Sequence, residues 1–377
     1  MQSLRTTQWR NVEDGEVEFS PGVNVLVGNN GQGKTNVLEA VLYLALGRSH
    51  RGSRDEEIVR FGGDHFYVRG VGKRDAGEAF EIEAGFAPPR SKRLKVDAQP
   101  VARLTDLVGV LACVAFGPED SELSRGGPQA RRRYVDYALA ETSTSSLHLL
   151  SDYRRAVQQR TALLRADFVS ATGLEVWDAE VVRLGHQVVA RRAEALIQLA
   201  PRARAAFATL AEDLRLTLTY RVHAIDRTID LETGAEELLR MLEDGEFDAQ
   251  FHLRLRARRA AEVARQQSLV GPHRDDVELL VEGRDLRRFG SQGQSRAAAV
   301  ALKMAQADFI RERRGDRPVV VLDDVFAELD DGRAATLWSM VCERHQTFLA
   351  VPRRSDLGLG RGDAVFEVRA GRLERAA

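Results

Sequence analysis

The chain has 377 residues, of which 44% are hydrophobic and 29% are charged, and its formal net charge is −1. This length and composition are typical of a globular protein with one large domain or two moderate ones, and the near-neutral balance gives no bulk sign of a nucleic-acid-binding protein. No segment approaches the roughly 18 consecutive apolar residues of a membrane span, and the start lacks the apolar core of a signal peptide. Cys113 and Cys342 are far apart without metal-ligand spacing, so we expect reduced thiols in a cytoplasmic protein with no membrane partner.

The N-terminal stretch reads as strands followed by a helix. Residues 2–9 and 16–19 are short, mixed runs bounded by Asn, Asp and Gly. GVNVLVG at 22–28 is a continuous apolar run, which is typical of a buried central strand. A helix is expected at about 34–46, with Gly47 as its stop.

The predicted secondary structure changes twice along the middle of the chain. Alternating runs at 64–96 predict an antiparallel meander. From 128 to about 261 the pattern is mostly helical, with LRLTLTYRV at 214–222 as a strand-like exception. After about 265 strands and helices alternate again. We therefore predict an α/β fold in which residues 1–120 and 262–377, from both ends of the chain, form one domain (lobe I). Residues 121–261 form an inserted, mainly helical domain (lobe II) without a long coiled coil.

Arginine is clustered at three places, 131–133, 254–259 and 311–314. A solvated helix face is the ordinary interpretation of such a cluster. A basic face can nevertheless bind phosphates in a chain whose total charge is neutral. Arg132 and Arg133 are expected to support the helical lobe rather than to contact DNA.

GNNGQGKT at 28–35 fits the phosphate-loop pattern G-x-x-x-x-G-K-[ST] between a strand and a helix. Its glycines let the backbone wrap closely around phosphates, which the N–H groups of the helix start can bind. Lys34 would reach the β- and γ-phosphates of ATP, and Thr35 would ligate Mg²⁺. The expected ATP-binding residues are Gly28, Asn29, Asn30, Gly31, Gln32, Gly33, Lys34 and Thr35.

VVVLDD at 319–324 is an apolar strand that ends in two carboxylates. Ligands bind along the C-terminal edge of a parallel sheet, so this strand would place acids beside the nucleotide. Asp323 suits Mg²⁺ coordination, and Asp324 would orient or deprotonate the attacking water. Together with Lys34 these are the expected catalytic residues.

FGSQGQ at 289–294 opens a strong helix far from the phosphate loop. Such a helix start also offers N–H groups and a positive dipole end, and a serine hydroxyl with a glutamine amide suits a γ-phosphate. An ordinary capped helix after a flexible loop is the alternative, and these residues alone do not decide between the two.

The order of these motifs, followed by AELD at 327–330, resembles the ABC-type ATPases of the SMC and Rad50 group. That resemblance implies that lobe I is a P-loop ATPase head domain of the ABC type, similar to the Rad50 and SMC heads. It also implies a head-to-tail, ATP-dependent homodimer with two composite sites. Ser291, Gly293 and Gln294 of one subunit would then clamp ATP held by the other. Asp330 would lie at the dimer seam.

Longer blocks narrow the resemblance to the RecF family of bacterial recombination mediators. They are LVGNNGQGKTNVLEAVLYLALGRSHR, VAFGPEDSEL with GGPQARRRYVDYAL, LVGPHRDDVELLVEG, FGSQGQSRAAAVALKMAQ and VVVLDDVFAELD. The resemblance implies slow, DNA-stimulated ATP hydrolysis that acts as a switch, and binding to double-stranded DNA at gaps or junctions. It also implies action with RecR and RecO to help load RecA in recombinational repair, replication restart and SOS induction.

Two features depart from the wider ATPase pattern, and several residues stay open. Asp324 stands where many ABC-type ATPases have Glu, which is consistent with slow hydrolysis. No clear switch histidine follows TFLAV at 347–351. A role near nucleotide or DNA stays open for Trp9, Arg10, Asn11, Ser49, His50, Arg51 and His273. For His273 a structural role is favoured.

Two alternatives remain at this stage. A P-loop kinase of a small molecule would need an acceptor pocket and a base, but neither Ser291 nor dimerisation. An ATPase subunit of a membrane transporter would usually place its signature much closer to the phosphate loop. The inserted lobe also argues against that second alternative.

Overall fold

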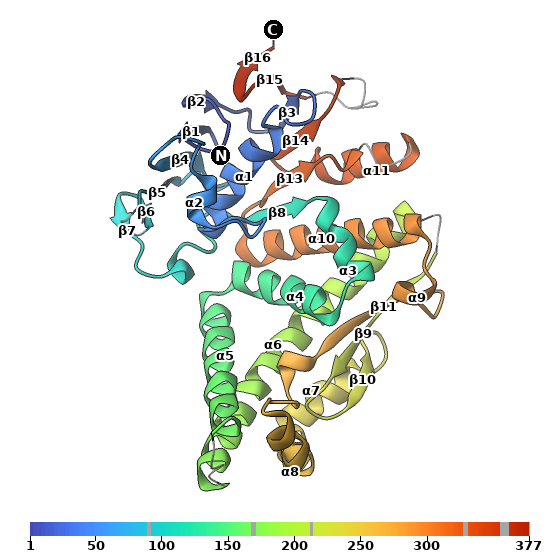
Figure 1. The fold of residues 1–377 in the computed structure, drawn as a ribbon. Coiled ribbons are helices and arrows are strands. Elements are labelled where there is room, and N and C mark those ends of the chain that lie inside the picture. Colours follow the sequence, from blue (N-terminus) through green and yellow to red (C-terminus); the bar gives the residue numbers. More distant parts are fainter. Residues whose placement is uncertain (89–91, 167–170, 212–213, 327–330, 355–361, 377) are drawn as a thin grey trace. The chain divides into compact units, whose positions relative to one another are not determined.

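The computed structural model describes residues 1–88, 92–166, 171–211, 214–326, 331–354 and 362–376. The chain forms two compact units (Figure 1). Unit 1 combines Met1–Asp120 with Gln306–Ala377, and unit 2 is Ser121–Ala305. Unit 2 begins at Ser121. The second compact unit extends past the predicted end of the lobe at residue 261, because strand β11 pairs with β9 inside the lobe.

Unit 1 contains the predicted central strands in a six-stranded sheet. Its order is β16-β15-β3-β14-β13-β8, and β15, β3, β14, β13 and β8 run parallel. The bounds are β3 Val23–Val27, β8 Cys113–Phe116, β13 Val319–Asp323, β14 Thr347–Val351, β15 Ala364–Arg369 and β16 Arg372–Arg375. The parallel arrangement brings the C-terminal ends of β3 and β13 to the same edge of the sheet, where ligands are expected.

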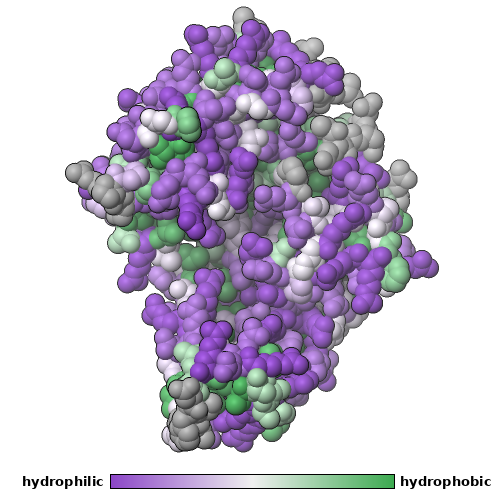
Figure 2. All heavy atoms as spheres, in the orientation of Figure 1, coloured by the Kyte–Doolittle hydropathy of each residue, from purple (hydrophilic) through white to green (hydrophobic). Residues whose placement is uncertain are grey.

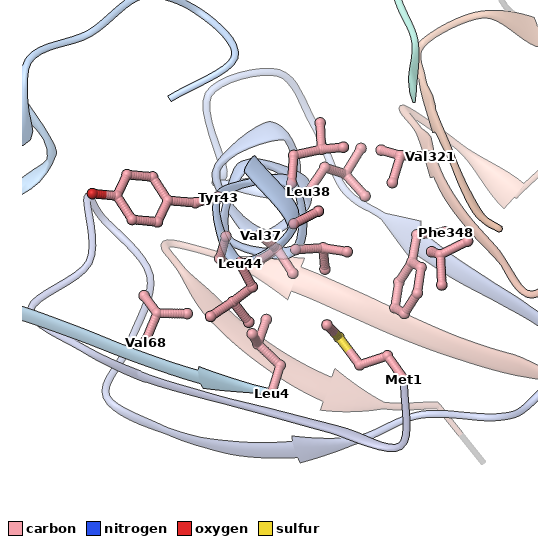
Figure 3. Packing of buried hydrophobic residues seen from close by; sticks show 14 of the residues in the cluster. Met1, Leu4, Val37, Leu38, Tyr43, Leu44, Val68, Val321 and Phe348 are labelled. Atoms are coloured by element: carbon pink, nitrogen blue, oxygen red, sulfur yellow. The ribbon is translucent and has the colours of Figure 1, made fainter. Parts of the chain in front are cut away.

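A second, antiparallel sheet of unit 1 has the order β2-β1-β4-β5-β6-β7. Its strands are β1 Ser3–Thr7, β2 Gly15–Glu18, β4 Phe66–Lys73, β5 Ala79–Phe86, β6 Arg93–Val96 and β7 Gln99–Pro100. Helix α1 (Lys34–Leu46) lies between the two sheets. Figure 3 shows Leu44 of α1 near Leu4 and Val68 of the antiparallel sheet, and Leu38 facing Val321 of the parallel sheet. Burial on both sides explains why α1 is apolar nearly all round.

The ends of α1 follow the local chemistry of the sequence. Gly33, the residue before the helix, has φ 113°, and Gly47 at its end has φ 65° and donates its N–H to the carbonyl of Tyr43. Both values lie in the left-handed region that glycine adopts at little cost. Helices α2 (Asp55–Ile58) and α11 (Asp331–Val341) also belong to unit 1.

Unit 2 is mainly helical with one small antiparallel sheet, β10-β9-β11-β12. Its helices are α3 Ser121–Arg125, α4 Pro128–Thr142, α5 Thr144–Leu164, α6 Ala171–Leu210, α7 Ala235–Glu243, α8 Glu246–Arg265 and α9 Leu286–Phe289. The strands are β9 Leu216–Val222, β10 Arg227–Asp230, β11 Asp276–Val281 and β12 Arg284–Asp285. Helix α10 (Gln292–Arg314) begins in unit 2 and ends in unit 1. The long helices and β9 confirm the predicted pattern.

Buried ion pairs hold unit 2 together. The guanidinium of Arg160 donates to Asp178 (2.6 Å) and to Glu262 (2.5 Å), and its side chain is fully buried. Arg131 donates twice to Asp276 (2.8 and 2.9 Å), and Arg132 donates to the carbonyl of Asp275 (2.6 Å). Such groups need partners inside a protein. Arg131 and Arg132 therefore serve packing, whereas Arg133 is exposed.

On the face seen in Figure 2, hydrophilic side chains predominate over both units, and apolar ones occur in small groups. Within the described ranges of the chain, no helix combines the length and hydropathy that crossing a membrane requires.

Candidate phosphate site and signature helix

The phosphate loop connects β3 to α1, as the sequence predicts. Gly31 has φ 79° and Gly33 has φ 113°, so the loop depends on left-handed backbone at both positions. A Cβ on Gly28 would lie 2.4 Å from the carbonyl oxygen of Val368, and one on Gly33 would lie 2.9 Å from Oδ1 of Asn11. Gly28 is therefore required by a close backbone neighbour, Gly31 by its conformation, and Gly33 by its conformation and by the nearby Asn11. Asn29 and Asn30 are exposed on the outer turn of the loop.

Lys34 folds back across the loop that precedes it. Its Nζ donates to the carbonyl of Gly28 (2.5 Å) and to that of Asn29 (3.3 Å), and the residue is only 4% exposed. This buried ammonium forms no ion pair within 4.0 Å among the described residues, and the carboxylate of Asp323 interacts with it only electrostatically. The arrangement fits a polyanion, whose oxygens would supply a counter-charge.

Thr35 and Asp323 meet at the C-terminal edge of the parallel sheet. The Thr35 hydroxyl donates to Oδ1 of Asp323 across 3.1 Å. Burial raises the pKa of Asp323, against the hydrogen bond from Thr35, and the nearby charge of Asp324 raises it further. A half-buried hydroxyl–carboxylate pair is a donor set that suits a hard cation such as Mg²⁺. The two expected metal ligands are thus brought together.

Asp324 follows directly and has a strained backbone. Its φ of 53° lies in the left-handed region, which is uncommon for a residue other than glycine. Its Oδ1 atom is buried and makes no hydrogen bond with the described residues. A buried carboxylate oxygen without a partner at a phosphate site suits a water or a bound ligand group.

The C-terminal hairpin braces the loop from one side. The backbone N–H of Ala370 donates to Oε1 of Gln32 (2.6 Å), and the N–H of Gly371 donates to the carbonyl of Gln32 (2.8 Å). From the other side, Asn11 donates to the carbonyl of Gly31 (3.3 Å). Segments from both ends of the chain therefore fix the loop.

A buried ion pair supports α1 behind the loop. Glu39 is fully buried and accepts two hydrogen bonds from the guanidinium of Arg10, each 3.0 Å long. The hydroxyl of Ser49 donates to Glu39 as well (2.5 Å), and Arg51 lies 3.8 Å from it. Arg10, Ser49 and Arg51, whose roles the sequence left open, thus converge on one carboxylate. Glu39 itself was missed, although a lone acid in the apolar run VLEAVLYLAL was a signal.

A hollow of 890 Å³ opens beside the phosphate loop. Asn36, the residue after Thr35, lines it together with Arg10 and Asn11. Asn36 donates to Oδ1 of Asn11 (2.7 Å), and its carbonyl accepts from the indole N–H of Trp9 (2.8 Å). Trp9 is fully buried, so it supports this wall and does not itself face the hollow.

The signature residues form a reciprocal cap at the start of α10, in unit 2. The N–H of Gln294 donates to the hydroxyl oxygen of Ser291 (3.1 Å), and the N–H of Ser291 donates to Oε1 of Gln294 (2.9 Å). This is a capping box. Ser291 is exposed, Gly293 and Gln294 are half-buried, and the hydroxyl proton of Ser291 is not used by this cap. The structure therefore shows a capped helix start, and this cap leaves the Ser291 hydroxyl proton unused, as the phosphate-binding interpretation requires.

Three remaining candidates have different outcomes. His273 uses both ring nitrogens internally, with Tyr153 (2.9 Å) and with the carbonyl of Ser268 (3.1 Å), and burial lowers its pKa to about 4. That is a structural histidine. His50 is half-buried, and burial lowers its pKa as well. Asp330 of AELD lies outside the described residues.

The chain is similar to known proteins over nearly its whole length. The family model described as RecF/RecN/SMC N terminal domain matches residues 1–357. The chain is 41% identical to the DNA replication and repair protein RecF of Symbiobacterium thermophilum, over 98% of this chain and 97% of that protein. It is 36% identical to the protein of the same description from Acidothermus cellulolyticus, over 97% of each.

Solved structures agree with these relatives. A structure described as the recombination mediator protein RecF-ATP in the RecFOR pathway is similar with a TM-score of 0.86 and 28% identity, covering 100% of this chain and 97% of that one. An SMC head bound to the C-winged helix domain of ScpA is similar with a TM-score of 0.57 and 14% identity, covering 100% and 97%. The second likeness concerns the fold alone.

Proposed function

Because this chain belongs to the RecF family, within the RecF/RecN/SMC proteins, we propose that it is an ATP-dependent, DNA-binding recombination mediator whose ATP-bound dimer closes on duplex DNA. The observation that carries the proposal is the pair of phosphate-directed elements in one chain. The loop at 28–35 belongs to unit 1, and the capped helix start at Ser291 belongs to unit 2. A relative described as RecF-ATP supports ATP as the nucleotide.

The loop would hold ATP in the subunit to which it belongs. Its N–H groups and the ammonium of Lys34 would bind the β- and γ-phosphates. Thr35 and Asp323 would hold Mg²⁺, which when bound neutralises charge on the phosphate oxygens. Asp324, whose Oδ1 has no described partner, would orient or deprotonate the attacking water. The hollow beside Asn36 would take the nucleoside end.

The start of α10 would act on the nucleotide of a second copy. Its free N–H groups and the Ser291 hydroxyl proton are donors for a γ-phosphate, and Gly293 and Gln294 keep the first turn compact. Two copies related by a two-fold axis then share two nucleotides, which makes ATP a reversible link between them. Hydrolysis would remove that link and act as a slow switch.

The proposed partners follow from the family. Double-stranded DNA with gaps or junctions is the substrate surface, and RecR, with RecO, is the protein partner that helps load RecA in the cytoplasm. The relatives and the full-length match leave no observation that favours a small-molecule kinase or a transporter subunit. Because phosphate contacts would dominate, DNA affinity should fall steeply with salt and depend little on sequence.

The test is molecular mass in solution by light scattering, with and without ATP–Mg²⁺ and with a gapped duplex, for the wild type and Ser291→Arg. We expect ATP to shift the wild type to a dimer and the variant to stay monomeric, because an arginine side chain would fill the space of the γ-phosphate. The variant should still bind a fluorescent ATP analogue, since its loop is intact. A wild type that stays monomeric with ATP and DNA bound would overturn the proposal.

A further inference from the structure

The segment just before the signature serine is basic, aromatic and exposed. We call Arg287, Arg288 and Phe289 the basic segment. Phe289 is 71% exposed, and the Arg288 side chain is 77% exposed with its nearest carboxylate, Asp285, 3.9 Å away. That carboxylate already accepts the backbone N–H groups of Arg287 (2.8 Å) and Arg288 (3.3 Å). In the described chain Arg287 has no ion pair, so the segment presents largely uncompensated positive charge around an apolar ring.

An acidic and aromatic rim lies beside the phosphate loop in unit 1. We call Glu56, Glu57 and Phe61 the acidic rim, and all three line the 890 Å³ hollow. Phe61 is fully exposed. Neither glutamate forms an ion pair with a described residue, whereas their neighbour Asp55 is paired with Lys92 at 3.2 Å. Arg10 and Arg60 also line the hollow, but each is paired with a carboxylate, Glu39 and Asp14 respectively. A single exposed Phe is ordinary, but here each ring lies near unpaired charges of one sign.

We propose that the basic segment of one copy docks on the acidic rim of a second copy when the ATP-bound dimer closes. This inference rests on the proposed function, because it requires Ser291 to approach the partner's nucleotide. The two surfaces carry opposite charge and one exposed Phe each. Complementary charges of this kind orient two proteins during association and disfavour other arrangements.

Chain length makes the contact reachable. Arg287 to Phe289 precede Ser291 by four to two residues, which spans at most roughly 7–14 Å of extended chain. On the other surface, Asn36 lines the hollow and directly follows Thr35, the expected metal ligand of the phosphate site. A serine at the γ-phosphate therefore carries the basic segment to the vicinity of the rim. The contact would occur twice in each two-fold dimer and would cover the nucleoside end.

The experiment is a charge reversal read by sedimentation or light scattering with ATP–Mg²⁺ at low salt. Arg287→Glu/Arg288→Glu should raise the dimer dissociation constant about ten-fold or more, since like charges would then face each other. Adding Glu56→Arg to the same chain should recover at least part of the loss, because both contacts of the dimer then carry the reversed pair. Glu57 is kept, since its carboxylate accepts the N–H of Arg54 at the start of α2.

The control is Arg256→Glu/Arg258→Glu, which makes the same charge change at two exposed arginines of α8. Binding of a fluorescent ATP analogue to the monomer should be unchanged in Arg287→Glu/Arg288→Glu and in Arg256→Glu/Arg258→Glu, because neither pair of residues lines the hollow. If the wild type dimerises and the reversal behaves like the control, or is not rescued by Glu56→Arg, the docking contact is wrong and the proposed function stands. If the wild type does not dimerise with ATP, both are overturned.

Discussion

The phosphate loop and the start of α10 are the two proposed phosphate sites, but the protein holds them in opposite ways. The loop is braced by the hairpin at Ala370, by Asn11 and by its own buried Lys34. The helix start is exposed at Ser291 and Gln292. Its polar side-chain contacts are the reciprocal pair between Ser291 and Gln294 and, at the end of the first turn, a hydrogen bond from Arg125 to the hydroxyl of Ser295. One half of the site is built within the chain, and the other is presented outward. This difference is what a nucleotide shared between two copies requires.

The largest expected effect comes from removing the buried charge of the braced half. Lys34→Ala should lower ATP affinity by about a thousand-fold, roughly 4 kcal/mol, because the phosphates lose their only buried ammonium in the described site. Fluorescence titration with an ATP analogue measures this loss. Lys73→Ala, at an exposed lysine of the same unit, is the matched control. Equal affinities for the two variants would show that Lys34 does not face the phosphates.

A smaller effect, on stability rather than on ATP affinity, is expected from breaking the ion pair of Glu39, which supports α1 behind the loop. Glu39→Gln should lower the free energy of unfolding of unit 1 by about 3 kcal/mol, because breaking a buried pair leaves the Arg10 guanidinium poorly compensated. Urea denaturation followed by tryptophan fluorescence measures it, since Trp9 is buried in this unit. Arg51→Gln removes the second basic partner of the Glu39 carboxylate. Because the Arg51 side chain is 45% exposed, this change should lower the free energy of unfolding by less than about 1 kcal/mol. Similar losses in both variants would contradict this ranking.

The same contrast explains how much could be predicted from the sequence. The loop, the Thr35 position and Asp323 were predictable because a glycine pattern between a strand and a helix, and acids after an apolar strand, are local signals. The meeting of Thr35 with Asp323 follows from parallel strand order. The carboxylate of Asp324 was predictable from the same signal as Asp323. Nothing in the sequence indicated the left-handed backbone conformation of Asp324.

Longer-range support was not predictable from local signals. Nothing in the spacing of Arg10 and Glu39 indicates that they pair, because the contact depends on how the antiparallel sheet packs on α1. Unit 2 likewise extends past residue 261, because β11 pairs with β9 although two α-helices separate these strands in the sequence. Contacts of this kind depend on tertiary packing, which overrides local pattern.

The smallest expected effect is a local loss of helix stability at the exposed start of α10. Gln294→Ala should weaken the first turn of α10 by about 1 kcal/mol, because the N–H of Ser291 loses its acceptor and half of the capping box is gone. Amide hydrogen exchange should then be roughly five-fold faster at the start of the helix, with no change in the phosphate loop. Gln292→Ala is the control, since it removes the same side chain from an exposed neighbouring position. If the two variants exchange alike, the Gln294 amide does not hold the helix start, and Ser291 would have to be positioned by the backbone alone.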